Sequence, residues 1–259
     1  MTNRVWDRTP ELHAPDVSAA SPVPQGAVRS IRAASLTAGI GLLLMSVLAA
    51  VGYVAIVQRL VTPGDPVATA TDIVGSAGLF RLGVAMLYGV IVLDVLVAWA
   101  LLGVFTTVNR NVSRLAAWFR VAYAAVFMVA IGHLAGVPDL LSNTGYSTAF
   151  TPEQLQGQAM VKVEAFHDTY MAGLILFGVH LLILGYLAYR SGYVPKAIGV
   201  LLAVAGIGYI VDSLVTVFTE GTPFAVSTVT FLGEFLLALW LLIRGRRLTL
   251  PPVAGTETR

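Results

Sequence analysis

The chain has 259 residues, of which 57% are apolar and only 12% are charged. A soluble domain carries about 25% charged residues, so this sequence has too little charge to cover a surface in water. The mean hydropathy of +0.81 agrees, and together these values argue against a soluble enzyme, a nucleic-acid binder and a disordered protein. The chain has no cysteine, which excludes disulfides, thiolate metal sites and iron–sulfur clusters.

Six apolar runs follow a polar, proline-rich stretch over residues 1–28, which we expect to be a disordered cytoplasmic tail. Each run is long enough to cross about 30 Å of hydrocarbon as a helix. In lipid the backbone N–H and C=O groups have no water to bond with, so such a segment must be helical. The runs are Ala34–Val57, Phe80–Phe105, Leu115–Val137, Ala165–Tyr189, Ala197–Phe218 and Phe224–Ile243. The sequence therefore predicts an all-α integral membrane protein. It would be a six-helix transmembrane bundle over residues 29–246 with a C-terminal tail over 247–259.

The distribution of Lys and Arg predicts the orientation. With a cytoplasmic N-terminus, thirteen of these residues fall on the cytoplasmic side and three, Arg59, Arg81 and Lys162, on the other. The positive-inside rule then places both termini in the cytoplasm. This bias also explains the pI near 9.0 without a nucleic-acid partner.

Two helix starts are predicted outside the membrane. Asp65 followed by Pro66 indicates a short helix over 66–76, with Asp as the N-cap and Pro at the first helical position. Thr151 and Gln154 form a capping-box pattern, so the fourth long helix should begin near Pro152, with a possible break at Gly157. Gly199, Gly206 and Gly208 are only weak evidence for a break in the fifth helix.

Ionisable side chains in hydrocarbon are costly, so each one is a candidate functional residue. Helical phase places Tyr209, Asp212, Ser213 and Thr216 on one face, and Ser227, Thr230 and Glu234 on another. Arg81, Tyr88 and Trp99 share a face of the second helix, with Asp94 about 140° away. We interpret these stripes as an outward-opening polar pocket that binds a ligand. Its predicted binding residues are Arg81, Tyr88, His133, His167, Tyr209, Asp212 and Glu234.

Packing roles are the alternative for the same residues. The Ser and Thr positions are better explained by hydrogen bonds to backbone carbonyls. Arg81 should form a salt bridge with Asp212 or Glu234, and Arg120 can extend to the inner headgroups. His180 lies 13 residues from His167 on another face, and we expect an interhelical hydrogen bond from it to Glu234 or Asp94.

A metal or haem site is less well supported. His133, His167, Asp168 and Asp212 lie at similar depth and have ligand chemistry. No His-x3-His or His-x-His spacing puts two ligands on one helix face, however. We therefore predict no metal and no cofactor.

Several short segments carry a family resemblance. They are Gly78-Leu-Phe-Arg-Leu-Gly83, Asn109-Arg110, Phe119-Arg120, Tyr146-Ser-Thr-Ala-Phe150, Ala165-Phe-His167, Phe177-Gly-Val-His180, Gly185 through Pro195, Gly208-Tyr-Ile-Val-Asp-Ser213, Gly233-Glu234 and Leu239-Trp240. Together they resemble the bacterial membrane family "domain of unknown function 4386" over about residues 30–245. The resemblance implies a six-helix protein of the bacterial inner, or plasma, membrane, with no established activity. The matched positions include Arg81, Arg120, His167, His180, Tyr209, Asp212 and Glu234.

The leading hypothesis is a protein that binds a small or lipid-like ligand from the outer side. One alternative is an intramembrane enzyme that acts on a lipid-like substrate, with His167 or His133 as a base or a metal ligand. The other is a non-catalytic membrane subunit or assembly factor whose polar residues only specify helix packing. The expected partners are the lipid bilayer and such a ligand, with no nucleic acid, and the oligomeric state is left open.

Overall fold

The computed structural model describes residues 25–218 and 232–245, and every regular element in these two ranges is helical. Five helical segments are long and apolar enough to cross a membrane, which makes the chain a multi-pass membrane protein. They are Ile31–Leu60, Ala77–Phe105, Arg110–Ser142, Pro152–Arg190 and Lys196–Thr216. Of the sixth predicted run, only the shorter apolar helix Leu232–Ile243 lies in the described part, and residues 224–231 lie outside it.

The elements follow one another with short connections. In chain order they are α1 (Gln25–Ala49), a π-helical continuation η1 (Ala50–Val57), a 3-10 turn η2 (Gln58–Leu60), α2 (Pro66–Gly75), α3 (Ala77–Phe105), α4 (Arg110–Ala135), α5 (Val137–Ser142), α6 (Thr144–Ser147), α7 (Pro152–Arg190), α8 (Lys196–Phe218) and α10 (Leu232–Ile243). The α3–α4 and α7–α8 connections are short, so each of these pairs is an antiparallel hairpin.

Both predicted helix starts are confirmed. The Asp65 side chain accepts a hydrogen bond from the backbone N–H of Ala68 at 2.9 Å and begins α2. Thr151 and Gln154 form the reciprocal capping box at the start of α7. The suggested break at Gly157 is wrong, because α7 runs without interruption from Pro152 to Arg190. A glycine lowers helix propensity by only about 1 kcal/mol, which a long packed helix tolerates.

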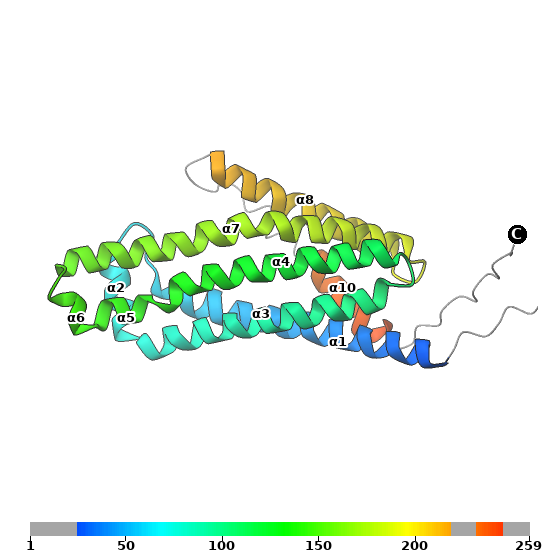
Figure 1. Ribbon diagram of the computed structural model, residues 1–259, viewed down its shortest axis with the longest axis horizontal. Coiled ribbons are helices and arrows are strands. Elements are labelled where there is room, and N and C mark those ends of the chain that lie inside the picture. The colour runs from blue at the N-terminus through cyan, green and yellow to red at the C-terminus, as the bar shows by residue number, and fades with distance from the viewer. Residues whose placement is uncertain (1–24, 219–231, 246–259) are drawn as a thin grey trace, which may run out of the picture.

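The long helices and α10 form a closed ring. Each packs on two neighbours in the order α1, α3, α4, α7, α8, α10 and back to α1. Figure 1 shows the long helices side by side, with α2, α5 and α6 gathered at one end, which we call the capped end. The α3–α4 and α7–α8 connections lie at the opposite end, which we call the turn end. A ring of helices encloses a common interior, and that interior is where a site can form.

The two surfaces of the ring differ in what they contact. The interior is filled by a continuous core, to which Phe80, Phe127 and Leu181 belong. Large apolar side chains also cover the outside, and Trp99 and Trp118 are 65% and 71% exposed. Exposed apolar surface on this scale is typical of a helix bundle that faces lipid.

Glycines set the close packing of α7 on α8. A Cβ atom added to Gly206 would lie 2.5 Å from the carbonyl oxygen of Gly178, and one added to Gly185 would lie 2.6 Å from that of Gly199. Only glycine permits this approach of two backbones. Gly199 and Gly206 of the fifth predicted helix are therefore packing positions, and α8 is continuous through them.

Candidate functional site

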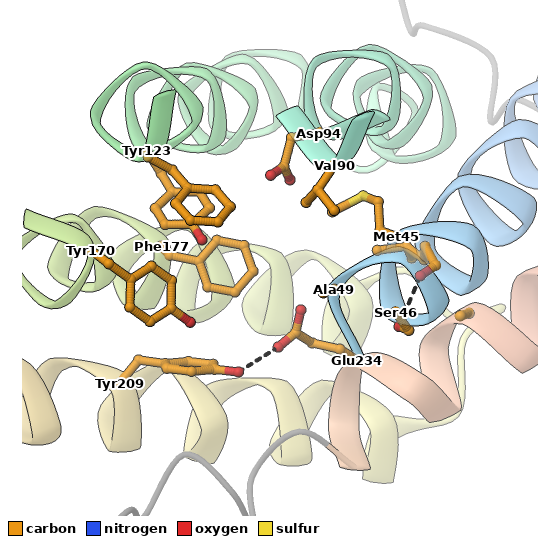
Figure 2. Close-up of a pocket in the computed structure, with 13 residues that line it drawn as sticks. Met45, Ser46, Ala49, Val90, Asp94, Tyr123, Tyr170, Phe177, Tyr209 and Glu234 are labelled. Carbon is orange, nitrogen blue, oxygen red and sulfur yellow. Dashed lines mark hydrogen bonds between the residues drawn. The ribbon is translucent and has the colours of Figure 1, made fainter. Parts of the chain in front are cut away.

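A cavity of about 220 Å³ lies at the centre of the ring. All six members of the ring contribute to its wall, and Figure 2 shows their side chains converging on it. The lining residues are Leu42, Met45, Ser46 and Ala49 from α1, Val90 and Asp94 from α3, Tyr123 and Phe127 from α4, Tyr170 and Phe177 from α7, Tyr209 from α8, and Glu234 and Ala238 from α10. The wall is mostly apolar and aromatic, with two carboxylates.

Asp94 forms a buried salt bridge with Arg120. The Arg120 Nη2 atom lies 2.7 Å from Asp94 Oδ1, and both side chains are 1% exposed. The second carboxylate oxygen, Oδ2, is buried and has no hydrogen-bond partner within residues 25–218 and 232–245. Burying two charges is costly unless they pair closely, which this geometry provides. Asp94 lines the central cavity, and Figure 2 shows its carboxylate on the cavity wall.

Three further groups hold the Arg120 guanidinium. Nη1 lies 3.3 Å from His180 Nε2, Nη2 lies 3.7 Å from the Met45 sulfur, and the Phe177 ring centre is 5.4 Å from the guanidinium carbon. His180 Nδ1 is 2.8 Å from the Ala116 carbonyl oxygen. Because a carbonyl only accepts, Nδ1 carries the proton and Nε2 accepts the bond from Arg120. Neutral His180 thus orients the arginine toward Asp94.

The partners of His180 and Arg120 differ from those predicted from the sequence. His180 does make an interhelical hydrogen bond, but its partners are Ala116 and Arg120, and neither Glu234 nor Asp94. The expectation that Arg120 extends to the headgroups is wrong, since its side chain is enclosed in the bundle. An acid at the same depth on the neighbouring helix supplies a closer partner than water at the membrane surface.

Glu234 reaches the cavity from the opposite wall. The Tyr209 hydroxyl donates a hydrogen bond to Glu234 Oε1 at 3.2 Å. Figure 2 shows Glu234 extending from α10 toward the space bounded by Tyr123, Tyr170 and Phe177. In the described residues, the salt bridges are Arg81–Asp139 and Arg120–Asp94, so Glu234 is not part of one there. Two carboxylates therefore face one small space, and a single arginine neutralises one of them.

A second, larger hollow lies toward the capped end. Its volume is about 740 Å³, and its lining includes Tyr53, Glu164, Phe166 and His167. Aromatic contacts separate it from the central cavity. Phe166 packs on Tyr170 with ring centres 6.1 Å apart and on Phe127 at 6.4 Å. Since Phe166 lines the hollow while Phe127 and Tyr170 line the central cavity, this layer of packed rings lies between the two spaces.

Arg81 and Tyr88 lie away from the central cavity. Both are exposed on the surface of α3. Arg81 Nη2 is 2.8 Å from Asp139 Oδ1 on α5, so the expected pairing with Asp212 or Glu234 is wrong. Helical phase separated Asp94 from these two residues as predicted, but the face toward the interior is the one that carries Asp94.

The other predicted residues occupy three separate places. His167 lines the larger hollow toward the capped end, His133 is half-buried near the end of α4, and Asp212 is buried in α8. No group of three His, Asp or Glu side chains in the described ranges could hold a metal ion, so the set weighed from the sequence, His133, His167, Asp168 and Asp212, does not come together there. Tyr209 and Glu234 do meet, at the central cavity.

The hydroxyl positions behave as packing residues. Ser213 donates to the backbone oxygen of Met171 on α7 at 2.7 Å and to that of Tyr209 at 2.8 Å. Thr216 donates to the backbone oxygen of Asp212. The preference for backbone hydrogen bonds at these positions is confirmed, and Ser227 and Thr230 lie outside the described residues.

Asp94, Arg120, Tyr123, Tyr170 and Phe177 were missing from the predicted site. One signal in the sequence could have identified the first two. Asp94 lies eleven residues before the end of α3 at Phe105, and Arg120 lies ten residues after the start of α4 at Arg110. Residues at equal distance from a helical hairpin turn meet at the same depth, here about 15–17 Å from the turn end. His180 also lies ten residues from the turn end of α7.

Comparison with known proteins identifies a family without an assigned activity. Residues 37–245 match a family model described as "Domain of unknown function (DUF4386)". An "Uncharacterized protein" of Archaeoglobus fulgidus (strain ATCC 49558 / DSM 4304 / JCM 9628 / NBRC 100126 / VC-16) is 38% identical over 160 residues, which are 62% of this chain and 82% of the relative. No solved structure matches the chain. The protein thus belongs to the DUF4386 family.

Proposed function

We propose that this protein binds a small or lipid-like ligand in the central cavity of a six-helix transmembrane bundle. The observation that carries the proposal is the convergence of Asp94 and Glu234 on a cavity inside an otherwise apolar ring. Acids within a membrane bundle are retained at a cost in stability, which makes a binding role the preferred explanation. Arg120 pairs with one oxygen of Asp94, and the carboxylates of both acids belong to residues that line the cavity.

The larger hollow toward the capped end offers a route by which a ligand would reach the central cavity. A ligand would pass from the capped end through the hollow lined by His167 and cross the aromatic layer of Phe127, Phe166 and Tyr170. The adjacent η1 segment is π-helical, a form that recurs at functional sites.

We infer that the capped end faces away from the cytoplasm and that both termini are cytoplasmic. Support comes from the Lys and Arg asymmetry, with Arg59, Arg81 and Lys162 alone on the outer side. In this arrangement the segment that contains α10 completes a sixth crossing of the plasma membrane. A topology reporter fused after Arg259 should be active only in the cytoplasm, and activity confined to the outer side would reverse the orientation.

The binding proposal is tested by filling the cavity. Ala49 lines it, whereas the next residue, Ala50, is exposed on the outer surface. We expect Ala49→Phe to remove small molecules or lipids that co-purify with the full-length protein, as measured by native mass spectrometry after extraction in mild detergent. Ala50→Phe is the matched control and should retain them. Equal ligand content in both variants, with both folded by circular dichroism, would count against the cavity as the site.

The enzyme hypothesis is less well supported by the arrangement of the described residues. His167 and His133 do not line the cavity that holds Asp94 and Glu234. A histidine acting as a base would therefore not share one space with these two acids. The packing hypothesis does explain the Asp94–Arg120–His180 network. It leaves Glu234 unexplained, because a residue that only specifies packing would not line an open cavity.

A further inference from the structure

The charges that face the central cavity are negative. Among the described residues, Asp94 and Glu234 are the acids in its wall, and no Lys, Arg or His lines it. Arg120 is 1% exposed, is absent from the lining, and uses its two terminal nitrogens on Asp94, His180 and Met45. An anionic ligand in this space would thus meet carboxylates without a cationic side chain to balance its charge.

The neutral part of the wall also favours a cation. Five aromatic residues line the cavity: Tyr123, Phe127, Tyr170, Phe177 and Tyr209. Aromatic faces attract cations through their quadrupole, and cages of such rings recognise quaternary ammonium groups. The Tyr209 hydroxyl donates a hydrogen bond to Glu234, and this bond holds the carboxylate at the side of the cavity.

Size restricts the ligand further. The cavity measures about 220 Å³, and an engineered cavity of about 150 Å³ in another protein holds benzene. An ammonium group with short substituents fits this volume, whereas a whole lipid does not. The ammonium can belong to a free small molecule or to a lipid headgroup that reaches in between helices.

We propose that the central cavity binds an ammonium group, with the carboxylates of Asp94 and Glu234 as counter-charges and the aromatic rings as its cage. This inference rests on the proposed function and specifies the class of ligand. The Oδ2 atom of Asp94 is buried and has no hydrogen-bond partner in the described part of the chain, and Figure 2 shows the Asp94 carboxylate on the side of the cavity across from Glu234. Because Arg120 balances one of the two acids, an ammonium in the cavity would balance the other.

The test compares three probes of one shape that differ in charge. Choline is the cation, 3,3-dimethylbutan-1-ol its neutral isostere, and 3,3-dimethylbutanoate an anion of similar size. Each is titrated into the full-length protein in mild detergent, and stabilisation is followed by thermal unfolding. We expect choline to stabilise the protein at a concentration at least tenfold lower than the alcohol, and the anion to have no effect. Glu234→Gln should remove the preference for choline, whereas Asp139→Asn, at the exposed ion pair, should keep it.

A lipid source is distinguished in nanodiscs. If the headgroup is the ligand, phosphatidylcholine discs should stabilise the protein more than phosphatidylglycerol discs, and Glu234→Gln should remove that difference. Stabilisation by neither free choline nor phosphatidylcholine overturns the ammonium assignment. Equal or stronger effects of the alcohol or the anion, lost in Ala49→Phe, also overturn it but leave the binding function intact. If Ala49→Phe and Ala50→Phe retain the same co-purified molecules, the binding function itself fails.

Discussion

The two ion pairs found within residues 25–218 and 232–245 have nearly the same N–O distance and opposite surroundings. Arg120 and Asp94 lie 2.7 Å apart at the centre of the ring, and Arg81 and Asp139 lie 2.8 Å apart at the capped end. The central side chains are 1% exposed, while those at the capped end are 57% and 73% exposed. Water screens the second pair, whereas breaking the first leaves a charge in a low-dielectric interior. Burial therefore decides how much each pair matters for stability.

The largest loss of stability is expected when one partner of the central ion pair is removed. Asp94→Ala leaves Arg120 as an uncompensated buried charge, and we expect it to lower the free energy of unfolding by about 3–5 kcal/mol. Chemical unfolding of the full-length protein in mild detergent measures this loss. The double variant Asp94→Leu with Arg120→Met removes both charges and should recover most of it. A double variant as unstable as Asp94→Ala would contradict the electrostatic explanation.

Removal of His180 should have the next largest effect. His180→Ala deprives Arg120 Nη1 of its acceptor and leaves the Ala116 oxygen without its donor. A buried unsatisfied polar group costs about 1–3 kcal/mol, and we expect a loss of unfolding free energy in that range. His133→Ala is the control, because that histidine is only half-buried near the capped end. Comparable losses in the two variants would remove the special role of His180.

Tyr193 at the turn end gives an intermediate case. Its hydroxyl donates to the Val104 oxygen at 2.7 Å, and Tyr193→Phe should lose about 1 kcal/mol at neutral pH. Burial raises the pKa of Tyr193 from 10.0 to about 12. The unfolded chain then ionises first, so this stabilisation is complete below pH 10 and disappears between about pH 10 and 12. Unfolding of both proteins across this range measures the effect, and a stability difference that stays constant to pH 12 would disprove the assignment.

The smallest effect is expected at the exposed pair. Arg81→Ala should change the unfolding free energy by about 0.2–1 kcal/mol, because both partners are solvated. Raising the salt concentration should reduce even this difference by screening. Unfolding measured at low and high salt gives the comparison with Asp94→Ala, which should depend little on salt. A loss as large as that of Asp94→Ala would mean that exposure does not separate the two pairs.

Part of the candidate site follows from helical phase and depth, and part does not. Tyr209 and Glu234 were predicted and do meet, since each is the polar member of a helix face that turns inward. Arg81 and Tyr88 were predicted from the same kind of stripe but are exposed. Phase relates residues within one helix and leaves open which face meets the neighbours. The helical phase therefore placed Asp94 on a different face of the helix from Arg81, as observed. Asp94 was nevertheless left out of the predicted pocket, although it lines the central cavity.

The sequence by itself determined the membrane-protein class, the positions of five long helices and the caps at Asp65 and Thr151. These depend on local composition and on backbone groups that must be satisfied within a few residues. Only the tertiary structure decided that the helices close into a ring, that Arg120 pairs with Asp94, and that a cavity remains beside Glu234. The physical reason is that these features depend on which faces of separate helices meet. In an apolar chain nearly every face is able to pack, so hydrophobicity alone does not select among them.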